Sequence, residues 1–142
     1  MTTDSPVLPQ ARRFRLLVAL LMTMLLAACA GRPDFATLDT RVVPDAPLEA
    51  GDSAELRVAL ESLGADGSRG ELIAETTSSG VSDTPMDVSL QFDARALEAG
   101  RDYALIAEIR EDGLVTHRNR EQVAVSAGDI GTQRIEIPLT PR

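Results

Sequence analysis

The sequence has no lysine and no tryptophan, and it contains one cysteine, one histidine, one tyrosine and three phenylalanines. One histidine and one cysteine cannot supply the three or four nitrogen and sulfur ligands of a zinc site. Aromatic rings are the usual stacking platforms of single-strand nucleic-acid sites, and this chain has almost none. We therefore predict a core of leucine, isoleucine, valine and alanine, with no metal and no other cofactor.

The single cysteine, Cys29, follows Leu26, Ala27 and Ala28 at the end of an apolar run over residues 16–26. Three arginines precede that run. A basic start, an apolar stretch of roughly 7–15 residues and small residues before the cleavage site are typical of a secretory signal peptide. The run is shorter than the roughly 20 apolar residues of a spanning helix. We predict that residues 1–28 are a cleaved lipoprotein signal peptide with a lipobox.

Cleavage at this lipobox makes Cys29 the first residue of the mature chain and the site of lipid attachment. Each buried methylene of an acyl chain contributes about 0.8 kcal/mol, and two or three chains together anchor a protein stably. The alternative is an unmodified Cys29 in an ordinary signal peptide. Ala30 follows the cysteine, and by the usual bacterial sorting convention the absence of aspartate there favours the outer membrane. We expect a lipid anchor in that membrane, facing the periplasm.

The mature chain is strongly acidic. The whole sequence has a formal net charge of −8, and the first 28 residues carry three arginines and one aspartate, so the remainder carries −10. Nucleic acids and anionic lipid surfaces repel such a domain. No cysteine remains after Cys29, so an intramolecular disulfide is excluded. We expect residues 29–36 to be the lipidated cysteine with a tether, and residues 37–142 to be one domain.

Alternation of apolar and polar residues predicts strands in this domain. The pattern has period two over residues 54–61, apart from Ala59, and it is without exception over residues 86–93. A third alternating strand begins at Tyr103, and Glu111-Asp112-Gly113 has the Asp-Gly signature of a hairpin turn. Weaker strand patterns occupy residues 38–43, 72–76, 114–118, 122–125 and 134–139. We predict a single antiparallel β-sandwich of seven to eight short strands.

The strand after Tyr103 is apolar on both faces, which is typical of a central strand. Ala104 and Ile106 lie on the face opposite the expected core. Either a loop or second layer covers them, or they form a partner-binding patch. On the second interpretation, Ile106→Glu abolishes partner capture and leaves the fold intact. An exposed sheet edge that accepts a partner strand is another candidate binding site.

No catalytic constellation is convincing. A hydrolase triad needs a nucleophile, a histidine and an orienting acid, and His117 is the only histidine. Ser126 and Asp129 lie near it in sequence, but no Gly-x-Ser-x-Gly motif accompanies them. Asp66-Gly67-Ser68 is similar to a fragment of a calcium loop but lacks the remaining acidic ligands, so a turn is the better interpretation. We predict that the protein is not an enzyme.

A set of strand and turn segments carries a family resemblance. The segments are Pro47–Leu60, Ile73–Glu75, Val88–Asp93, Tyr103, Ala107–Arg110, Gly113–Leu114 and Val123–Val125. They resemble the YbaY-like lipoproteins, which share a family with the YscW-type lipoprotein chaperones, or pilotins, of type III secretion. The resemblance covers residues 43–125, and the lipobox fits it.

The resemblance implies a β-sandwich on an outer-membrane lipid anchor and, for the pilotin branch, the binding and delivery of a secretin subunit. We therefore expect a non-catalytic lipoprotein that acts through protein binding, as a secretion or assembly chaperone with an envelope client. Two alternatives remain open. One is a structural or stress-related envelope lipoprotein, and the other is a module that binds a small ligand or peptidoglycan.

Overall fold

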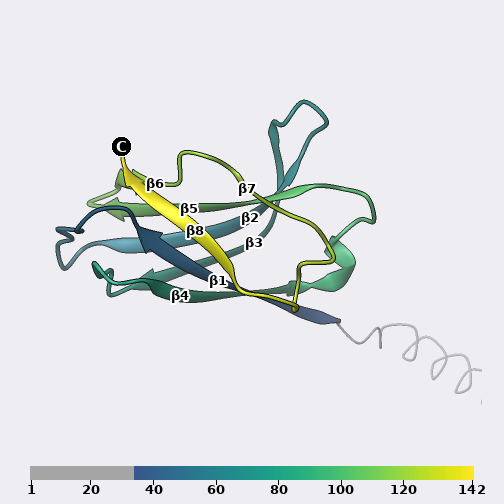
Figure 1. Ribbon diagram of the computed structural model, residues 1–142, viewed down its shortest axis with the longest axis horizontal. Coiled ribbons are helices and arrows are strands. Elements are labelled where there is room, and N and C mark those ends of the chain that lie inside the picture. Colours follow the sequence, from purple (N-terminus) through teal and green to yellow (C-terminus); the bar gives the residue numbers. More distant parts are fainter. Residues whose placement is uncertain (1–33) are drawn as a thin grey trace, which may run out of the picture. The chain divides into compact units, whose positions relative to one another are not determined.

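Eight β-strands and one short 3-10 turn make up residues 34–142, the part of the chain that the computed structural model describes (Figure 1). The strand over Met86–Asp93 has the bounds that its alternation predicts, because every second side chain enters the core. In chain order the elements are β1 (Phe35–Pro44), β2 (Glu55–Leu63), β3 (Arg69–Ser79), β4 (Met86–Asp93), η1 (Ala94–Ala96), β5 (Tyr103–Glu111), β6 (Leu114–Arg118), β7 (Val123–Val125) and β8 (Ile135–Pro141).

The strands follow one hydrogen-bonded path in the order β3-β2-β5-β6-β8-β1-β4, with β7 paired to β5. Figure 1 shows β1 and β8 crossing the face formed by β2, β3 and β5, so the path folds back on itself as a sandwich. Its two ends, β3 and β4, meet where the Thr76 hydroxyl donates to the Ser89 carbonyl at 3.4 Å. The predicted β-sandwich is confirmed, and it is nearly closed into a barrel.

The core lies between the two layers and is almost wholly aliphatic. Leu38 and Leu90, from β1 and β4, are fully buried against Leu60 and Leu105, from β2 and β5. Burying a side chain of this size contributes roughly 1.5–3 kcal/mol, so a core of leucine, isoleucine and valine stabilises a domain that has no tryptophan. The buried ring of Tyr103 completes the core at the start of β5.

The central position of β5 is confirmed. It pairs with β2 along one edge, and along the other edge it pairs first with β7 and then with β6. Ala59 interrupts the alternation of β2 because it lies opposite Ile106 of β5, and the outward-facing side chains of both residues are buried. The neighbouring strands β2 and β5, which carry apolar residues on both faces, therefore lie in the middle of the layer that also contains β3 and β6.

The hairpin between β5 and β6 has the turn that its sequence predicts. Asp112 and Gly113 both have positive φ, at 49° and 81°, as a two-residue type I′ turn requires. A different constraint acts at Gly70 of β3, where an added Cβ would lie 2.6 Å from the Ser62 hydroxyl oxygen. That hydroxyl accepts a hydrogen bond from the Glu71 amide at 2.8 Å, beside the irregular register of β2 and β3. A glycine lets the two backbones approach at this bulge.

Two details of the ends of the domain differ from expectation. The first strand begins at Phe35, so Phe35 and Ala36, expected in the tether, pair with β4. The sandwich is not wholly antiparallel, because β8 runs parallel to β1. Residues 126–134 connect β7, which pairs with β5, to β8, which pairs with β1.

Pro138 lies inside β8 although a proline has no backbone N–H to donate to a strand ladder. It pairs with Val43 of β1, and β6 reaches only Thr140 and Pro141 on the other side. At Pro138 the strand therefore has a ladder partner on one side only. A residue without a backbone N–H is tolerated at such a position.

Candidate functional site

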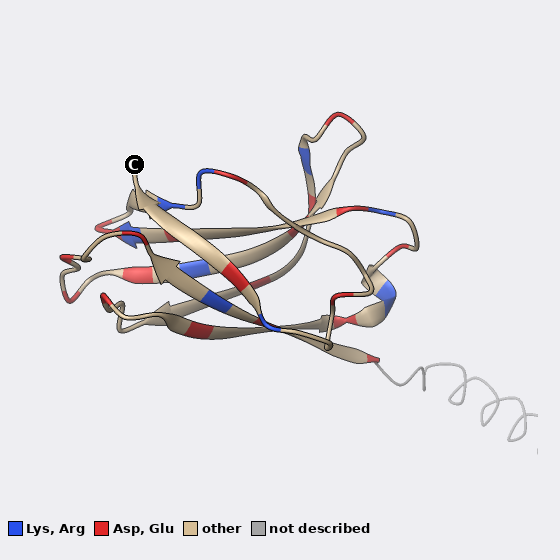
Figure 2. Ribbon diagram, viewed as in Figure 1, with Lys and Arg blue, Asp and Glu red and all other residues tan. Residues whose placement is uncertain are grey.

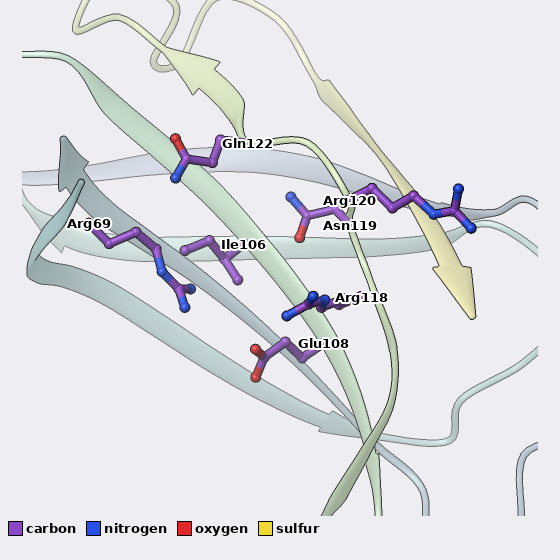
Figure 3. Close-up of a pocket in the computed structure, with 7 residues that line it drawn as sticks. All are labelled: Arg69, Ile106, Glu108, Arg118, Asn119, Arg120 and Gln122. Carbon is purple, nitrogen blue, oxygen red and sulfur yellow. The ribbon is translucent and has the colours of Figure 1, made fainter. Parts of the chain in front are cut away.

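A pocket of about 200 Å³ opens on the outer face of β5, above Ile106 (Figure 3). Its wall combines side chains from β3, β5, β6 and the loop between β6 and β7. Polar and charged groups surround one apolar residue at its base. We call it the Ile106 pocket, and its lining residues are Arg69, Ile106, Glu108, Arg118, Asn119, Arg120 and Gln122.

The two residues proposed as a partner-binding patch lie on this outer face. Ala104 is fully buried, between Glu61 of β2 and Ala124 of β7 in the two ladders. Ile106 retains 5% of its exposure and forms the base of the pocket. The structure therefore covers Ala104 and leaves only Ile106 within reach of a ligand. Partner binding by either residue stays a prediction.

The expectation that Ile106→Glu leaves the fold intact stays a prediction, and the burial of Ile106 makes it a demanding one. A side chain with 5% exposure would place a new carboxylate in a nearly buried position. This position lies between Arg69 and Arg118 at the base of the pocket, so the variant changes the packing on β5 and the charge of the pocket together. Substitutions at the rim of the pocket test partner binding more cleanly.

Asn119 fixes the loop that forms one wall. Its side-chain oxygen accepts from the Ala107 amide at 2.9 Å, and its side-chain nitrogen donates to the carbonyls of Leu105 at 3.1 Å and Glu121 at 2.8 Å. Its own amide donates to the Ala107 carbonyl at 3.2 Å. These bonds satisfy the edge of β5 where β6 has ended and β7 has not begun. Sequence reasoning missed this residue, because nothing local distinguishes it from a solvated loop asparagine.

Next to the pocket, the outer face carries a network of ion pairs. Arg57 contacts Glu75 at 2.6 Å and Glu108 at 3.7 Å, and Glu108 also contacts Arg110 at 3.0 Å. The Glu108 side chain is 13% exposed, so two guanidiniums accompany a largely covered carboxylate. These contacts join β2, β3 and β5 across the face. The sequence shows the charges but not which of them meet.

Two arginines of the pocket stand outside this network. Within residues 34–142, neither Arg118 nor Arg120 forms an ion pair with a carboxylate. Arg69 makes only a long contact with Glu61, at 3.6 Å. Figure 3 shows Arg69 and Arg118 on two sides of Ile106, whereas the guanidinium of Arg120 points away from it. The lining of the pocket is thus positively charged. The domain as a whole is acidic, and its acidic residues lie on many turns and strands (Figure 2).

The groups considered for catalysis serve local structure. The Asp129 carboxylate accepts from the Ser126 hydroxyl at 2.7 Å and from the Ser126 amide at 2.9 Å, and these bonds, the hydroxyl bond first, lower the pKa of Asp129. His117 lies on β6 opposite Ile109, with its Nδ1 3.1 Å from the Thr116 hydroxyl. Ser126 and Asp129 therefore lie in one turn, whereas His117 lies on strand β6.

The segment Asp66-Gly67-Ser68 forms a turn, as its preferred interpretation predicts. The Asp66 carboxylate accepts from the Ser68 amide at 3.0 Å and from its hydroxyl at 2.6 Å. The hydroxyl bond is the larger of the two effects that lower the pKa of Asp66. Across residues 34–142 no three histidine, cysteine, aspartate or glutamate side chains gather in a metal-binding arrangement.

The lipid-attachment prediction falls outside this part of the chain. Leu26, Ala27, Ala28 and Cys29 precede residue 34, so they lie outside the described residues. From residue 34 onward, the structure contains no helix of the length and apolarity needed to cross a membrane.

Comparison with known proteins gives the class of this domain. A family model described as "Type III secretion system lipoprotein chaperone (YscW)" matches residues 37–137. Because the match spans well over half of the sequence, the chain belongs to the YscW family. The predicted resemblance to the YscW-type chaperones is confirmed, and the narrower YbaY-like assignment stays a prediction. No curated protein matches the sequence closely enough to count as a relative.

Among solved structures, the fold is similar to an alternative pilotin from the type II secretion system of Vibrio cholerae. The TM-score is 0.66 at 20% sequence identity, and the alignment covers 77% of this chain and 98% of the pilotin chain. At this identity the likeness shows a shared fold. The family model and this structure are both described in terms of chaperone or pilotin roles in secretion.

Proposed function

We propose that this protein is a lipid-anchored, non-catalytic lipoprotein of the outer membrane that binds a secretion-system client in the periplasm and assists its delivery or assembly. The family match over residues 37–137 carries the proposal, because that family is described as a lipoprotein chaperone of type III secretion. The pilotin-like fold of a type II secretion protein supports the same role. A secretin subunit or another secretion protein is the expected client.

The anchor in this proposal is Cys29. The lipobox, the basic start and the short apolar run support its lipidation. Radiolabelled palmitate fed to growing cells should label the wild-type protein, and Cys29→Ala should remove the label. Label that persists on Cys29→Ala contradicts the proposed anchor.

The binding activity is tested by crosslinking in living cells, followed by affinity capture through a C-terminal tag. We expect one dominant envelope client in near-stoichiometric amount. Capture with no enriched client under several growth conditions contradicts the chaperone role and favours a general envelope lipoprotein.

A rim variant separates the pocket from the anchor in this test. Arg118→Gln changes an exposed side chain that makes no ion pair in residues 34–142, so we expect the fold to be retained. If the client docks on the outer face of β5, this variant captures less of it while remaining membrane-bound. Cys29→Ala should instead keep the client and lose the membrane location.

A further inference from the structure

We propose that the Ile106 pocket binds a carboxylate that belongs to an acidic segment of a partner protein. The proposal deepens the proposed function and rests on it only in taking the carboxylate to be part of a protein. It names a recognition group, a glutamate or aspartate side chain or a C-terminus, and it names the place on this domain that receives it.

Charge carries the first step. Arg69, Arg118 and Arg120 line the pocket, and Glu108 is its one acidic residue. Guanidinium groups present several N–H donors in a planar fork that matches a carboxylate. Arg118 has no carboxylate partner within residues 34–142, and the guanidinium of Arg69 meets Glu61 only through a 3.6 Å contact from Nε. Donors on both arginines are therefore open to an incoming anion.

Glu108 does not oppose an incoming anion strongly, because its charge is already offset. Its carboxylate lies 3.0 Å from the Arg110 guanidinium and 3.7 Å from that of Arg57. Glu108 and Arg118 are register partners in the ladder of β5 and β6, and within residues 34–142 no ion pair joins their side chains. The lining of the pocket therefore carries three arginines and one glutamate, a net positive charge on a domain whose own net charge is strongly negative. Electrostatic complementarity therefore favours an acidic ligand at this place.

Size and shape favour a side chain rather than a larger molecule. The cavity of about 200 Å³ is smaller than the roughly 300–1,000 Å³ of common small-molecule sites. Ile106 supplies an apolar base for the methylene groups of a ligand side chain, and Figure 3 shows it between Arg69 and Arg118. The Gln122 amide adds a polar group at the rim.

The wall of the pocket is rigid enough to hold this geometry. Asn119 joins the loop to β5 through contacts with Ala107 and Leu105 at 2.9 and 3.1 Å. Arg118 ends a paired strand, so its backbone is fixed on one side by Glu108 and on the other by Thr140. A preorganised pair of donors binds an anion with a smaller loss of conformational entropy.

The test uses NMR amide shifts of the full lipoprotein in non-ionic detergent micelles. The probe is an acetylated and amidated hexapeptide in which glutamate alternates with leucine, and the matched control replaces each glutamate with glutamine. We expect the glutamate peptide to shift the amides of Ile106 and of residues 119–122. The glutamine peptide should bind about tenfold or more weakly, because it lacks the charge-assisted hydrogen bonds.

Variants connect the shifts to the arginines. Arg118→Gln should weaken the glutamate peptide about tenfold, and Arg118→Lys should restore part of the binding because it keeps the charge. Arg101→Gln removes the same charge from a loop outside the pocket and should leave binding unchanged. Unaltered amide shifts elsewhere in each variant show that its fold is intact.

Three results would overturn the proposal. They are equal binding of the glutamate and glutamine peptides, peptide shifts that avoid the pocket, and inorganic phosphate shifting the pocket amides at the same concentration as the glutamate peptide. Failure of the proposed function is a different observation, because it shows as the absence of a captured client with the wild-type chain. A client captured equally well by Arg118→Gln contradicts the site and leaves the chaperone role standing.

Discussion

Asn119 lies beside the edge of β5 between the stretch paired with β7 and the stretch paired with β6. Its side chain forms the hydrogen bonds to β5 that a neighbouring strand would otherwise form. Its amide group bonds the backbone of Ala107 and Leu105 on β5 and of Glu121 in its own loop. Asn119 is 9% exposed, so these bonds are largely shielded from water. Asn119 thus links the core fold to the wall of the Ile106 pocket.

Replacement of Asn119 by alanine should destabilise the domain by about 2–3 kcal/mol, because it leaves buried backbone groups of β5 without partners. Thermal and urea unfolding measure the loss. Gln122→Ala in the same loop is the matched control, since Gln122 is exposed and its side chain makes only a 3.5 Å contact with the Gly67 carbonyl. Equal stabilities of the two variants would show that Asn119 has no such role.

Tyr103 is the second residue whose polar group matters inside the fold. Its ring is fully buried, and its hydroxyl oxygen accepts from the Glu98 amide at 2.7 Å, which ties the loop before β5 to the core. Tyr103→Phe keeps the ring and removes the bond, so it should cost about 1 kcal/mol. Urea unfolding of the two chains gives the difference, and an unchanged midpoint would contradict this assignment.

The sequence predicts Ile106 as an outward apolar residue because period two places it there without any tertiary information. It could not predict the arginines around it. Arg69 comes from β3, and Arg118 and Arg120 follow the β5 hairpin, so only the register of β3, β2, β5 and β6 brings them to one place. The alternation places Ala104 and Ile106 on the same outward face and does not show which of them is covered. The pairing of β7 beside Ala104 decides it.

At the scale of elements, local turn chemistry was readable and long-range pairing was not. The Asp112-Gly113 turn and the bounds of β4 follow from neighbours in sequence. The parallel pairing of β8 with β1 joins residues almost a whole domain apart, and neither strand carries a local mark of its partner. The extension of β1 to Phe35 was hidden for the same reason, since its pairing with β4 creates it.

The hairpin between β5 and β6 provides a test at this scale. Gly113 has a φ of 81° and open space where a Cβ would lie, so Gly113→Ala introduces backbone strain without a clash. We expect a loss of about 1 kcal/mol in the free energy of unfolding.

The matched control is Gly128→Ala, where φ is not in the left-handed region and the nearest atom to an added Cβ is the Ser126 hydroxyl oxygen at 3.8 Å. Gly128→Ala should leave the free energy of unfolding nearly unchanged, and urea titration measures this free energy for both variants. Equal effects of the two substitutions would exclude backbone strain as the cause.

For the molecule as a whole, acid should weaken the fold. Hydrogen bonds and arginine partners lower the pKa of four surface aspartates below the ordinary value, namely Asp66, Asp87, Asp93 and Asp129. A carboxylate with a lowered folded-state pKa contributes stability above its unfolded pKa of about 3.9 and loses it as the pH falls through the folded value. The melting temperature should therefore decline below about pH 4, and added salt should reduce the effect for these exposed groups.

Asp87 allows this prediction to be assigned to a residue. The Arg41 side chain donates to it at 2.8 Å, and this bond is the main reason that its pKa is lowered. Asp87→Asn should make the melting temperature less sensitive to pH in the acid range. A melting temperature that rises on acidification, or an unchanged acid response in the variant, would contradict the account.

The fold and the family follow from core and turn residues, whereas function depends on surfaces that those residues do not specify. A sandwich fold shared at 20% identity does not specify which residues lie on the surface. The binding partner that we propose for this protein must therefore be found by experiment.

One measurement tests the central claim most directly: the membrane fraction in which the crosslinked client is recovered, compared between the wild-type chain and Cys29→Ala. Recovery of one client with the outer membrane in the wild type, and its loss from that fraction in Cys29→Ala, is the predicted result. A client whose location does not change between the two chains, or the absence of any client, would contradict the account.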